Sequence, residues 1–318
     1  METRHDSVLL TEAIERLAVQ EGDTVVDATI GGAGHFVALM KVMGPKGTLV
    51  GIDADHDAVE RARAAVAERK GEELPRIELV EDNFSNLASI LAQTGATSPN
   101  RVLFDLGWSS FQLTTGKGFS FRADEPLLMT YGSPETSETT AADLVNHLSE
   151  TSLADMIFSL GEERFSRGIA KSIVAARTEA PITSTFALVE AIEAGVPAWY
   201  RHRKLHPATK TFQALRIAVN NELGALRSGL STALATLAPE GRIAVITFHS
   251  IEDRIVKSMF RDAAYAGQGT LVSKKPIVPS AEELLRNPRA RSAKLRVFES
   301  VERGDSSFIS KSLTSLYA

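Results

Sequence analysis

The sequence predicts an α/β protein with a mainly parallel sheet and an inserted helical subdomain. Two patterns carry this prediction. Short apolar runs alternate with helical patterns between residues 24 and 105, which is typical of a parallel sheet covered by helices on both faces. The alternation then stops, and residues 111–206 show loops and helical patterns without an obvious strand. We therefore expect a core formed by residues 1–110 and 207–318, with residues 111–206 as the insertion.

Seven extended segments make up the predicted sheet. Five apolar runs are expected to be buried parallel strands: DTVVDAT, TLVGIDAD, IELVEDNF, RVLFDLGWSS and GRIAVITFHS. The later segments TLVSKKPIVPS and KLRVFESVE predict an antiparallel edge of the same sheet.

Apolar residues at helical spacing predict the helices between these strands. The first helix is expected within HDSVLLTEAIERLAV, with Asp6 or Ser7 as its N-terminal cap. Four helical patterns fill the insertion, and residues 209–241 predict one long helix or two that return to the outer layer of the core. We expect Ser250 with Asp253 to cap the helix after the fifth strand.

The composition narrows the class of protein. The 318 residues are 43% hydrophobic and 24% charged, an ordinary composition for a soluble protein. No apolar run approaches the roughly 20 residues of a membrane helix, and the N-terminus lacks the pattern of a signal peptide. The absence of cysteine excludes disulfides, thiolate zinc sites and cysteine nucleophiles. These features predict a cytoplasmic protein.

A glycine-rich segment and an aspartate mark the first candidate site. Gly31, Gly32 and Gly34 follow the first strand, and Asp53 ends the second. Ligands of open parallel sheets bind outside the carboxyl ends of the strands, where a carboxylate at the second strand accepts hydrogen bonds from ribose hydroxyls. The pair predicts a nucleoside cofactor, against the alternative of a tight turn with an exposed aspartate.

Further strand ends favour S-adenosylmethionine as that cofactor. The glycines do not match the G-x-G-x-x-G pattern of dinucleotide sites, and no phosphate-binding lysine follows them. Asp82 or Asn83 is placed to accept the adenine amino group, and Phe84 to lie on the adenine face. Asp105, at the fourth strand, is placed near the ammonium group of the cofactor or the reacting amine of a substrate.

Nine blocks along the chain resemble a known family. They run in order from His5 to Arg296: HDSVLLTEAI, DATIGGAGH, GIDAD, DLGWSSFQL, GFSF, GEERFSRGIAKSIV, HPATKTFQALRIAVNNEL, TFHSIEDRIVK and NPRARSAKLR. The family is RsmH, also called MraW, whose bacterial members methylate the exocyclic N4 amine of a cytidine in 16S ribosomal RNA of the small subunit. The resemblance implies a class I S-adenosylmethionine-dependent methyltransferase core, Rossmann-like and seven-stranded, with a helical insertion for substrate recognition.

The resemblance also implies cofactor contacts. They fall on the loop residues Ala33, Gly34 and His35, on the ribose acid Asp53, on the adenine-side aromatic Phe84, on Asp105 and on Gln112. The chain departs from the family at Phe111, where a proline is usual, and at Leu128 and Thr130, where an aspartate and an arginine are usual. These departures put details of the substrate in doubt more than they do the cofactor.

Three residues are candidates for catalysis. Asp105 is expected to accept a hydrogen bond, and later a proton, from the cytosine amine, with pure cofactor binding as its alternative. Trp108 is expected to hold the base by stacking, or else to be a core residue. His249 ends the fifth strand, where it orients the base or has a structural role. We expect no metal site, although His202 and His206 have helix-like spacing.

Two basic segments predict contact with RNA. The first contains Arg201, Arg203, Lys204 and Lys210, and the second Arg289, Arg291, Lys294 and Arg296. The alternative is an ordinary solvated surface. Because the net charge is −5, the expected substrate is an assembled or nearly assembled small subunit rather than free RNA. A homodimer, a diverged substrate and an inactive ribosome-binding protein stay open as alternatives.

Overall fold

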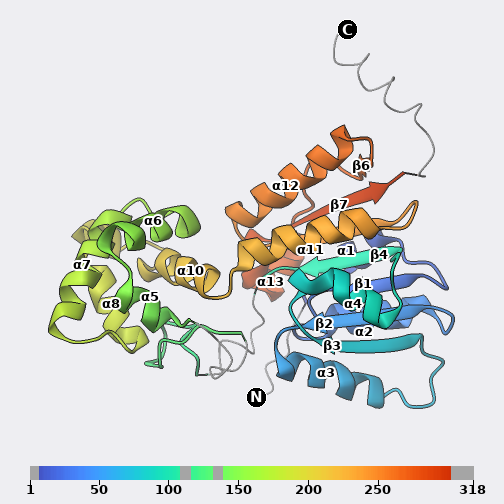
Figure 1. Ribbon diagram of the computed structural model, residues 1–318, viewed down its shortest axis with the longest axis horizontal. Helices are drawn as coiled ribbons and strands as arrows, with labels where there is room; N and C mark the ends of the chain where they lie inside the picture. Colours follow the sequence, from blue (N-terminus) through green and yellow to red (C-terminus); the bar gives the residue numbers. More distant parts are fainter. Residues whose placement is uncertain (1–6, 108–115, 132–138, 302–318) are drawn as a thin grey trace, which may run out of the picture. The chain divides into compact units, whose positions relative to one another are not determined.

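The chain divides into two compact units. The computed structural model describes residues 7–107, 116–131 and 139–301. Residues 1–108 and 224–318 form unit 1, and residues 109–223 form unit 2 (Figure 1). The expected boundary at residue 207 lies before helix α10 (Ala208–Val219), which the structure groups with unit 2. Phe212 and Leu215 of this helix belong to the hydrophobic core of unit 2, so α10 does not return to the outer layer of unit 1.

Unit 1 contains one seven-stranded sheet, as predicted. Its strands are β1 (Thr24–Asp27), β2 (Thr48–Asp53), β3 (Arg76–Glu81), β4 (Arg101–Asp105), β5 (Arg242–Thr247), β6 (Gly269–Leu271) and β7 (Lys294–Ser300). They lie in the order β3-β2-β1-β4-β5-β7-β6. The first five strands are parallel, and β7 is antiparallel to both β5 and β6, which confirms the expected antiparallel edge.

Helices cover both faces of this sheet. Helices α1 (Leu10–Leu17), α2 (Gly34–Met43) and α3 (His56–Ala67) pack in succession on the face that buries Leu103. Successive side chains of β7 point to opposite faces of the sheet, and Phe298 lies on the face opposite to Val297. There Phe298 contacts Phe260 of α12 (Ser250–Tyr265). Helices α4 (Leu87–Thr94) and α11 (Glu222–Thr236) lie on that side as well (Figure 1). The short α13 (Ala281–Arg286) precedes β7.

Two predicted helix caps are wrong. Helix α1 begins at Leu10, and Leu9 before it adopts a left-handed conformation without a side-chain cap, so Ser7 is not the cap; Asp6 lies outside the described residues. Helix α12 is capped by His249, because this side chain and Glu252 exchange hydrogen bonds with each other's backbone amides in a capping box.

Unit 2 is helical. It contains α5 (Ala141–His147), α6 (Glu150–Gly161), α7 (Ser166–Glu179), α8 (Thr185–Ala194), the short α9 (Ala198–Arg201) and α10. The four helices predicted for the insertion are present, whereas α9 was not predicted. The unit has its own apolar core, formed by residues such as Ile157, Ile169 and Leu188. Among the described residues of the whole chain, no helix is long and apolar enough to span a membrane.

Candidate active site at the strand ends

The candidate site lies where the order of the strands reverses. β1 is flanked by β2 and β4, so the chain runs to one edge of the sheet from β1 to β3 and to the other edge from β4 onward. Ligands of open α/β sheets bind at the carboxyl ends of strands at such a switch point. Asp27, Asp53 and Asp105 are the last residues of β1, β2 and β4. The topology therefore brings three carboxylates to one region.

Hydrogen bonds with Asp53 and Arg61 hold the glycine loop after β1. The Gly31 amide donates to Asp53 Oδ2 at 2.8 Å, and the Arg61 guanidinium donates to the Gly31 carbonyl at 3.2 Å. Ala33 adopts a left-handed conformation with φ of 63°, which places Gly34 at the start of α2. A side chain at Gly34 would collide with the Ser7 hydroxyl, which explains why glycine is required there.

Asp53 is held beside this loop. Its second oxygen accepts a hydrogen bond from the Asp55 amide at 2.9 Å, so each carboxylate oxygen has one backbone partner. Burial raises the pKa of Asp53 to about 6, although the two amides oppose the shift. Each oxygen keeps a free lone pair, and hydroxyl donors from a ligand would stabilise the charged form.

Asp27, His35 and the partly buried Asp105 form a cluster next to the glycine loop; we call it the strand-end cluster. His35 Nδ1 is 3.3 Å from Asp105 Oδ2, and the imidazole is 3% exposed. The Asp105 amide donates to the Thr29 hydroxyl at 2.7 Å, and the Thr29 amide donates to Asp27 Oδ1 at 3.2 Å. The loop that leaves β1 thus ties the ends of β1 and β4 together.

Burial sets the protonation of this cluster. Asp27 is fully buried, and desolvation raises its pKa to about 7 despite the nearby His35. Burial lowers the pKa of His35, but the hydrogen bond and charge of Asp105 outweigh it, so the net shift is upward. Asp27 and Thr29 are not among the site residues predicted from the sequence. The sequence pattern could have identified Asp27, because burying a carboxylate at the end of an apolar strand costs free energy unless the carboxylate is paired or binds a ligand.

The strand-end cluster fits a cationic cofactor. Asp27 Oδ2 and Asp105 Oδ1 are buried and lack a hydrogen-bond partner among the described residues. Buried polar groups are nearly always paired, so these carboxylate oxygens indicate a donor that the described residues do not provide. An ammonium or sulfonium group has the charge that these oxygens require. The cluster therefore suits S-adenosylmethionine better than a phosphate-bearing ligand.

The polar residues at the end of β3 take part in local hydrogen bonds, and their predicted contact with adenine stays a prediction. Asp82 accepts hydrogen bonds from the Asn83 amide and the Asn86 side chain, and Asn83 Oδ1 accepts from the Ser85 amide. These oxygens thus order the turn that carries Phe84. The half-buried Phe84 ring packs edge-on against Phe104 at 5.6 Å, and Gly229 of α11 leaves room for it.

The end of β5 is held by local contacts. His249 Nδ1 accepts the Glu252 amide at 3.4 Å, and Nε2 lies 3.1 Å from Glu252 Oε1, so the ring is part of the cap of α12. Asp253 lies 2.7 Å from Arg296 Nε and 2.9 Å from Lys294 Nζ. Burial opposes the shift, yet these two cations hold the pKa of Asp253 below its usual value. Lys294 and Arg296 are therefore engaged within unit 1 rather than offered as free basic groups.

Other predicted residues are placed as follows. Trp108, Phe111 and Gln112 lie outside the described residues. Arg289 and Arg291 are exposed in the turn before β7, whose Lys294 pairs with Thr247 at the carboxyl end of β5. In unit 2, Arg201, Arg203 and Lys204 are exposed, and Lys210 donates to the Glu162 carbonyl at 2.7 Å.

The segment around Leu128 and Thr130, which departs from the family pattern, packs in the interior of unit 2. Thr130 is 1% exposed, Leu128 is partly buried, and Met129 has a φ of 58°. The Tyr131 amide donates to Asn220 Oδ1 at 2.9 Å, and the Tyr131 hydroxyl donates to Glu222 at 2.7 Å.

The sheet order, the fastened glycine loop and the strand-end acids define a nucleoside-binding α/β enzyme. Comparison with known proteins narrows the class. Residues 2–301 match the model of the MraW methylase family. The chain belongs to the MraW methylase family, which confirms the predicted family and the predicted methyltransferase class.

The names of curated relatives support the same family assignment. The chain is 47% identical to Ribosomal RNA small subunit methyltransferase H of Deinococcus radiodurans, over 93% of this chain and 89% of the relative. It is 42% identical to the protein of that name from Lachnospira eligens, over 95% and 99%. Among solved structures, a putative methyltransferase from Streptococcus mutans in complex with SAH covers 93% of this chain and 99% of its own, at 9% identity and a TM-score of 0.44; this weak similarity carries no further argument.

Proposed function

We propose that this protein transfers the methyl group of S-adenosylmethionine to the N4 amine of a cytidine in 16S ribosomal RNA of the small subunit. The two relatives named above are small-subunit ribosomal RNA methyltransferases by name, and each aligns over more than nine-tenths of this chain. The observation that carries the proposal is the strand-end cluster beside the glycine loop, because its carboxylate oxygens without a partner among the described residues suit a cationic methyl donor.

Residues of unit 1 hold the cofactor in this proposal. Asp53 accepts hydrogen bonds from the ribose hydroxyls, and Ala33, Gly34 and His35 form the wall of the loop beside it. The Phe84 ring covers the adenine side. Gly31, Gly32 and Gln112 complete the set of contacts that we assign from the sequence. The methyl group is already activated on the sulfonium when the cofactor is bound.

Asp105 has the central chemical role. The cytosine amine is a weak nucleophile because its lone pair is delocalised into the ring, and a carboxylate acceptor localises that lone pair. As the nitrogen–methyl bond forms and the carbon–sulfur bond breaks, the amine releases a proton that the Asp105 carboxylate accepts. His35 is a positioning residue, since its imidazole holds the other Asp105 oxygen at 3.3 Å.

In this proposal His249 supports the site, whereas Trp108 contacts the substrate base. His249 orients the start of α12 through its capping contacts, which support the turn after β5. Trp108 follows β4 directly in the sequence and is our candidate to stack on the extruded cytosine.

The basic side chains are proposed to contact RNA. The group consists of Arg201, Arg203, Lys204, Lys210, Arg289 and Arg291. Because the whole chain carries a net charge of −5, we propose a folded small subunit in the cytoplasm as the substrate rather than free RNA.

A labelled transfer assay tests this proposal. The protein is incubated with methyl-labelled S-adenosylmethionine and small subunits that lack the modification, and the RNA is digested to nucleosides. We expect label in N4-methylcytidine. Label in another nucleoside or in ribosomal protein would overturn the proposed target, and absence of label with intact cofactor binding would overturn the proposed activity.

A further inference from the structure

An aromatic cluster on the surface of unit 2 is not explained by packing alone. It consists of Phe165, which directly precedes α7, and of Trp199 and Tyr200 on α9. The three rings meet edge to face, with centroids 4.7 to 5.9 Å apart. Tyr200 is 4% exposed, whereas Trp199 is 56% exposed. The cluster therefore presents one large ring to solvent on a support of two others.

One arginine lies against this exposed ring, and a second lies against the ring of Tyr200 that supports it. The Arg164 guanidinium carbon is 4.9 Å from the centroid of Trp199 and 4.7 Å from that of Phe165. Arg203 lies 5.1 Å from the Tyr200 ring. The segment from Ala198 to Lys210 contains four lysines and arginines and no acidic residue. Such a surface attracts a polyanion that also has flat apolar faces.

The support of Trp199 is anchored in the interior of unit 2. The Tyr200 hydroxyl donates to Glu163 Oε2 at 2.7 Å, and the Phe165 amide donates to Glu163 Oε1 at 2.8 Å. Glu163 is fully buried. One carboxylate thus fixes both supporting rings, so the exposed ring is held in place before any ligand binds. A preorganised ring loses little side-chain entropy on binding.

We propose that Trp199 is a stacking platform for an unpaired base of the RNA substrate, with Arg164 and Arg203 as contacts to the adjoining phosphates. This inference rests on the proposed function and deepens it, because it names single-stranded RNA as the form that unit 2 binds. Neighbouring pairs cover the faces of the bases within duplex RNA except at its two ends, so a duplex offers far fewer base faces to Trp199 than a single strand does.

Fluorescence provides a direct test without the methyl donor. The chain contains two tryptophans, so a Trp108→Phe variant reports on Trp199 alone. This full-length variant is titrated with a single-stranded oligoribonucleotide, with the same strand annealed into a blunt duplex, and with whole small subunits. We expect saturable quenching by the single strand, weakened by added salt, and little change with the duplex.

Three outcomes would overturn the inference. The first is unchanged emission at single-strand concentrations that fluorescence anisotropy of the labelled RNA shows to be bound. The second is equal quenching by the duplex. The third is unchanged emission when whole small subunits bind, which would show that Trp199 does not contact the substrate.

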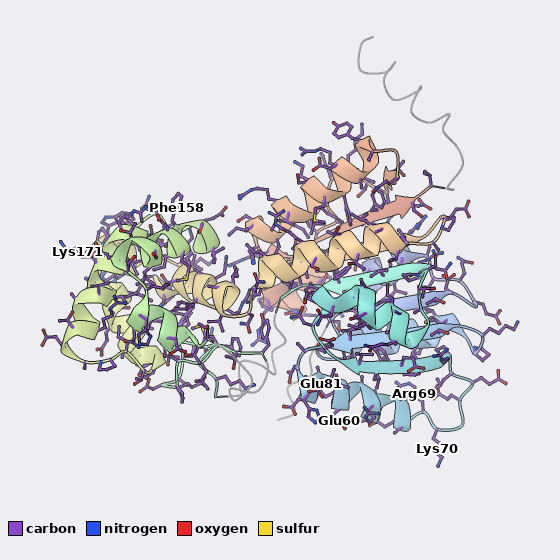
Figure 2. The ribbon with its side chains drawn as sticks, viewed as in Figure 1. Glu60, Arg69, Lys70, Glu81, Phe158 and Lys171 are labelled. Atoms are coloured by element: carbon purple, nitrogen blue, oxygen red, sulfur yellow. The ribbon has the colours of Figure 1, made fainter. Side chains whose placement is uncertain are left out.

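Kinetics of the otherwise unaltered enzyme provide a second test. Trp199→Ala should raise the KM for RNA roughly 5- to 150-fold, with kcat at saturating RNA and the Kd for S-adenosylmethionine unchanged. Trp199→Phe keeps a ring face and should recover most of the loss. Phe158, 59% exposed on α6 (Figure 2), provides the matched control, and Phe158→Ala should leave KM unchanged.

The two tests separate this inference from the proposed function. If the wild-type enzyme methylates ribosomal RNA and Trp199→Ala has the wild-type KM, the platform is refuted and the function stands. If the wild-type enzyme methylates no RNA, the proposed function fails, and the fluorescence titration still decides whether Trp199 binds single-stranded RNA.

Discussion

Two largely buried polar clusters in this protein differ in how completely their carboxylates are paired. In unit 2, Glu222 accepts two hydrogen bonds from Arg216, at 2.7 and 2.9 Å, and a third from the Tyr131 hydroxyl. In the strand-end cluster of unit 1, the one ring near both Asp27 and Asp105 among the described residues is His35, and each carboxylate has one buried oxygen without a partner there. The paired cluster holds a loop in place. The unpaired cluster retains an electrostatic cost that a bound cation can remove.

The largest expected effect comes from breaking the paired cluster. Arg216→Met leaves the Glu222 carboxylate without its cation and should lower the free energy of unfolding of unit 2 by about 3–5 kcal/mol. Urea denaturation followed by Trp199 fluorescence in a Trp108→Phe background measures it. The exposed pair of Arg167 with Asp155 is the control, and Arg167→Met should cost less than about 1 kcal/mol. Equal losses in both variants would contradict the distinction.

Asp27 should have the opposite effect, because its charge has too little compensation. Its raised pKa means that the native state keeps a proton that the unfolded state has released, so this carboxyl makes the ligand-free protein less stable as pH rises from about 4 to about 7. Asp27→Asn should exceed the wild type by about 1 kcal/mol at pH 4.5 and by up to about 4 kcal/mol at pH 8.

Urea unfolding of both ligand-free proteins, followed by far-UV circular dichroism, checks this at each pH. Asparagine preserves the acceptor for the Thr29 amide, so the comparison isolates the charge. A variant that is less stable than the wild type at pH 8 would show that Asp27 is adequately paired in the native state. We also expect the stabilised variant to bind S-adenosylmethionine more weakly.

The next largest effect is expected on catalysis, at Asp105 of the strand-end cluster. Asp105→Ala should lower kcat by 100-fold or more at saturating cofactor and RNA, because the amine loses its acceptor. Single-turnover methylation gives the rate, and calorimetry gives the affinity for S-adenosylmethionine. A variant that binds the cofactor poorly but reacts at the normal rate once saturated would restrict Asp105 to cofactor binding.

The smallest of these effects is expected for the conservative variant Asp53→Asn, because the oxygens of Asp53 already have backbone partners. Asp53→Asn keeps one acceptor oxygen and removes the charge, and it should weaken binding of S-adenosylmethionine roughly 10- to 100-fold. Asp53→Ala should abolish detectable binding. Wild-type binding should weaken below about pH 6 as Asp53 takes up a proton. Normal affinity of Asp53→Ala in calorimetry would remove the ribose assignment.

The sequence predicted the strands of unit 1 well, because each one is a short apolar run between turn residues. The antiparallel edge was also predicted, since KLRVFESVE alternates as a strand with two dissimilar faces does. Helix α9 was not predicted, because a four-residue helix has too few positions to show a period. The unusual caps at Leu9 and His249 break the composition rules for helix starts.

The candidate site was only partly predictable. Asp53 and the glycines follow a spacing that chain order alone reveals. The pairing of His35 with Asp105, by contrast, joins residues far apart in the sequence. Lys294 and Arg296 resembled a basic RNA-binding segment until the antiparallel register of β7 placed them beside Asp253. Charge along a sequence shows which groups exist, and only the fold shows which of them are already neutralised.

The place of unit 2 in the chain has a consequence for synthesis. β4 and β5 are neighbours in the sheet, yet the whole of unit 2 is translated between them. A nascent chain therefore has the open edge of β4 exposed until β5 emerges, while unit 2 already has a hydrophobic core of its own. We expect unit 2 to fold during translation, and unit 1 to close only near the end of synthesis.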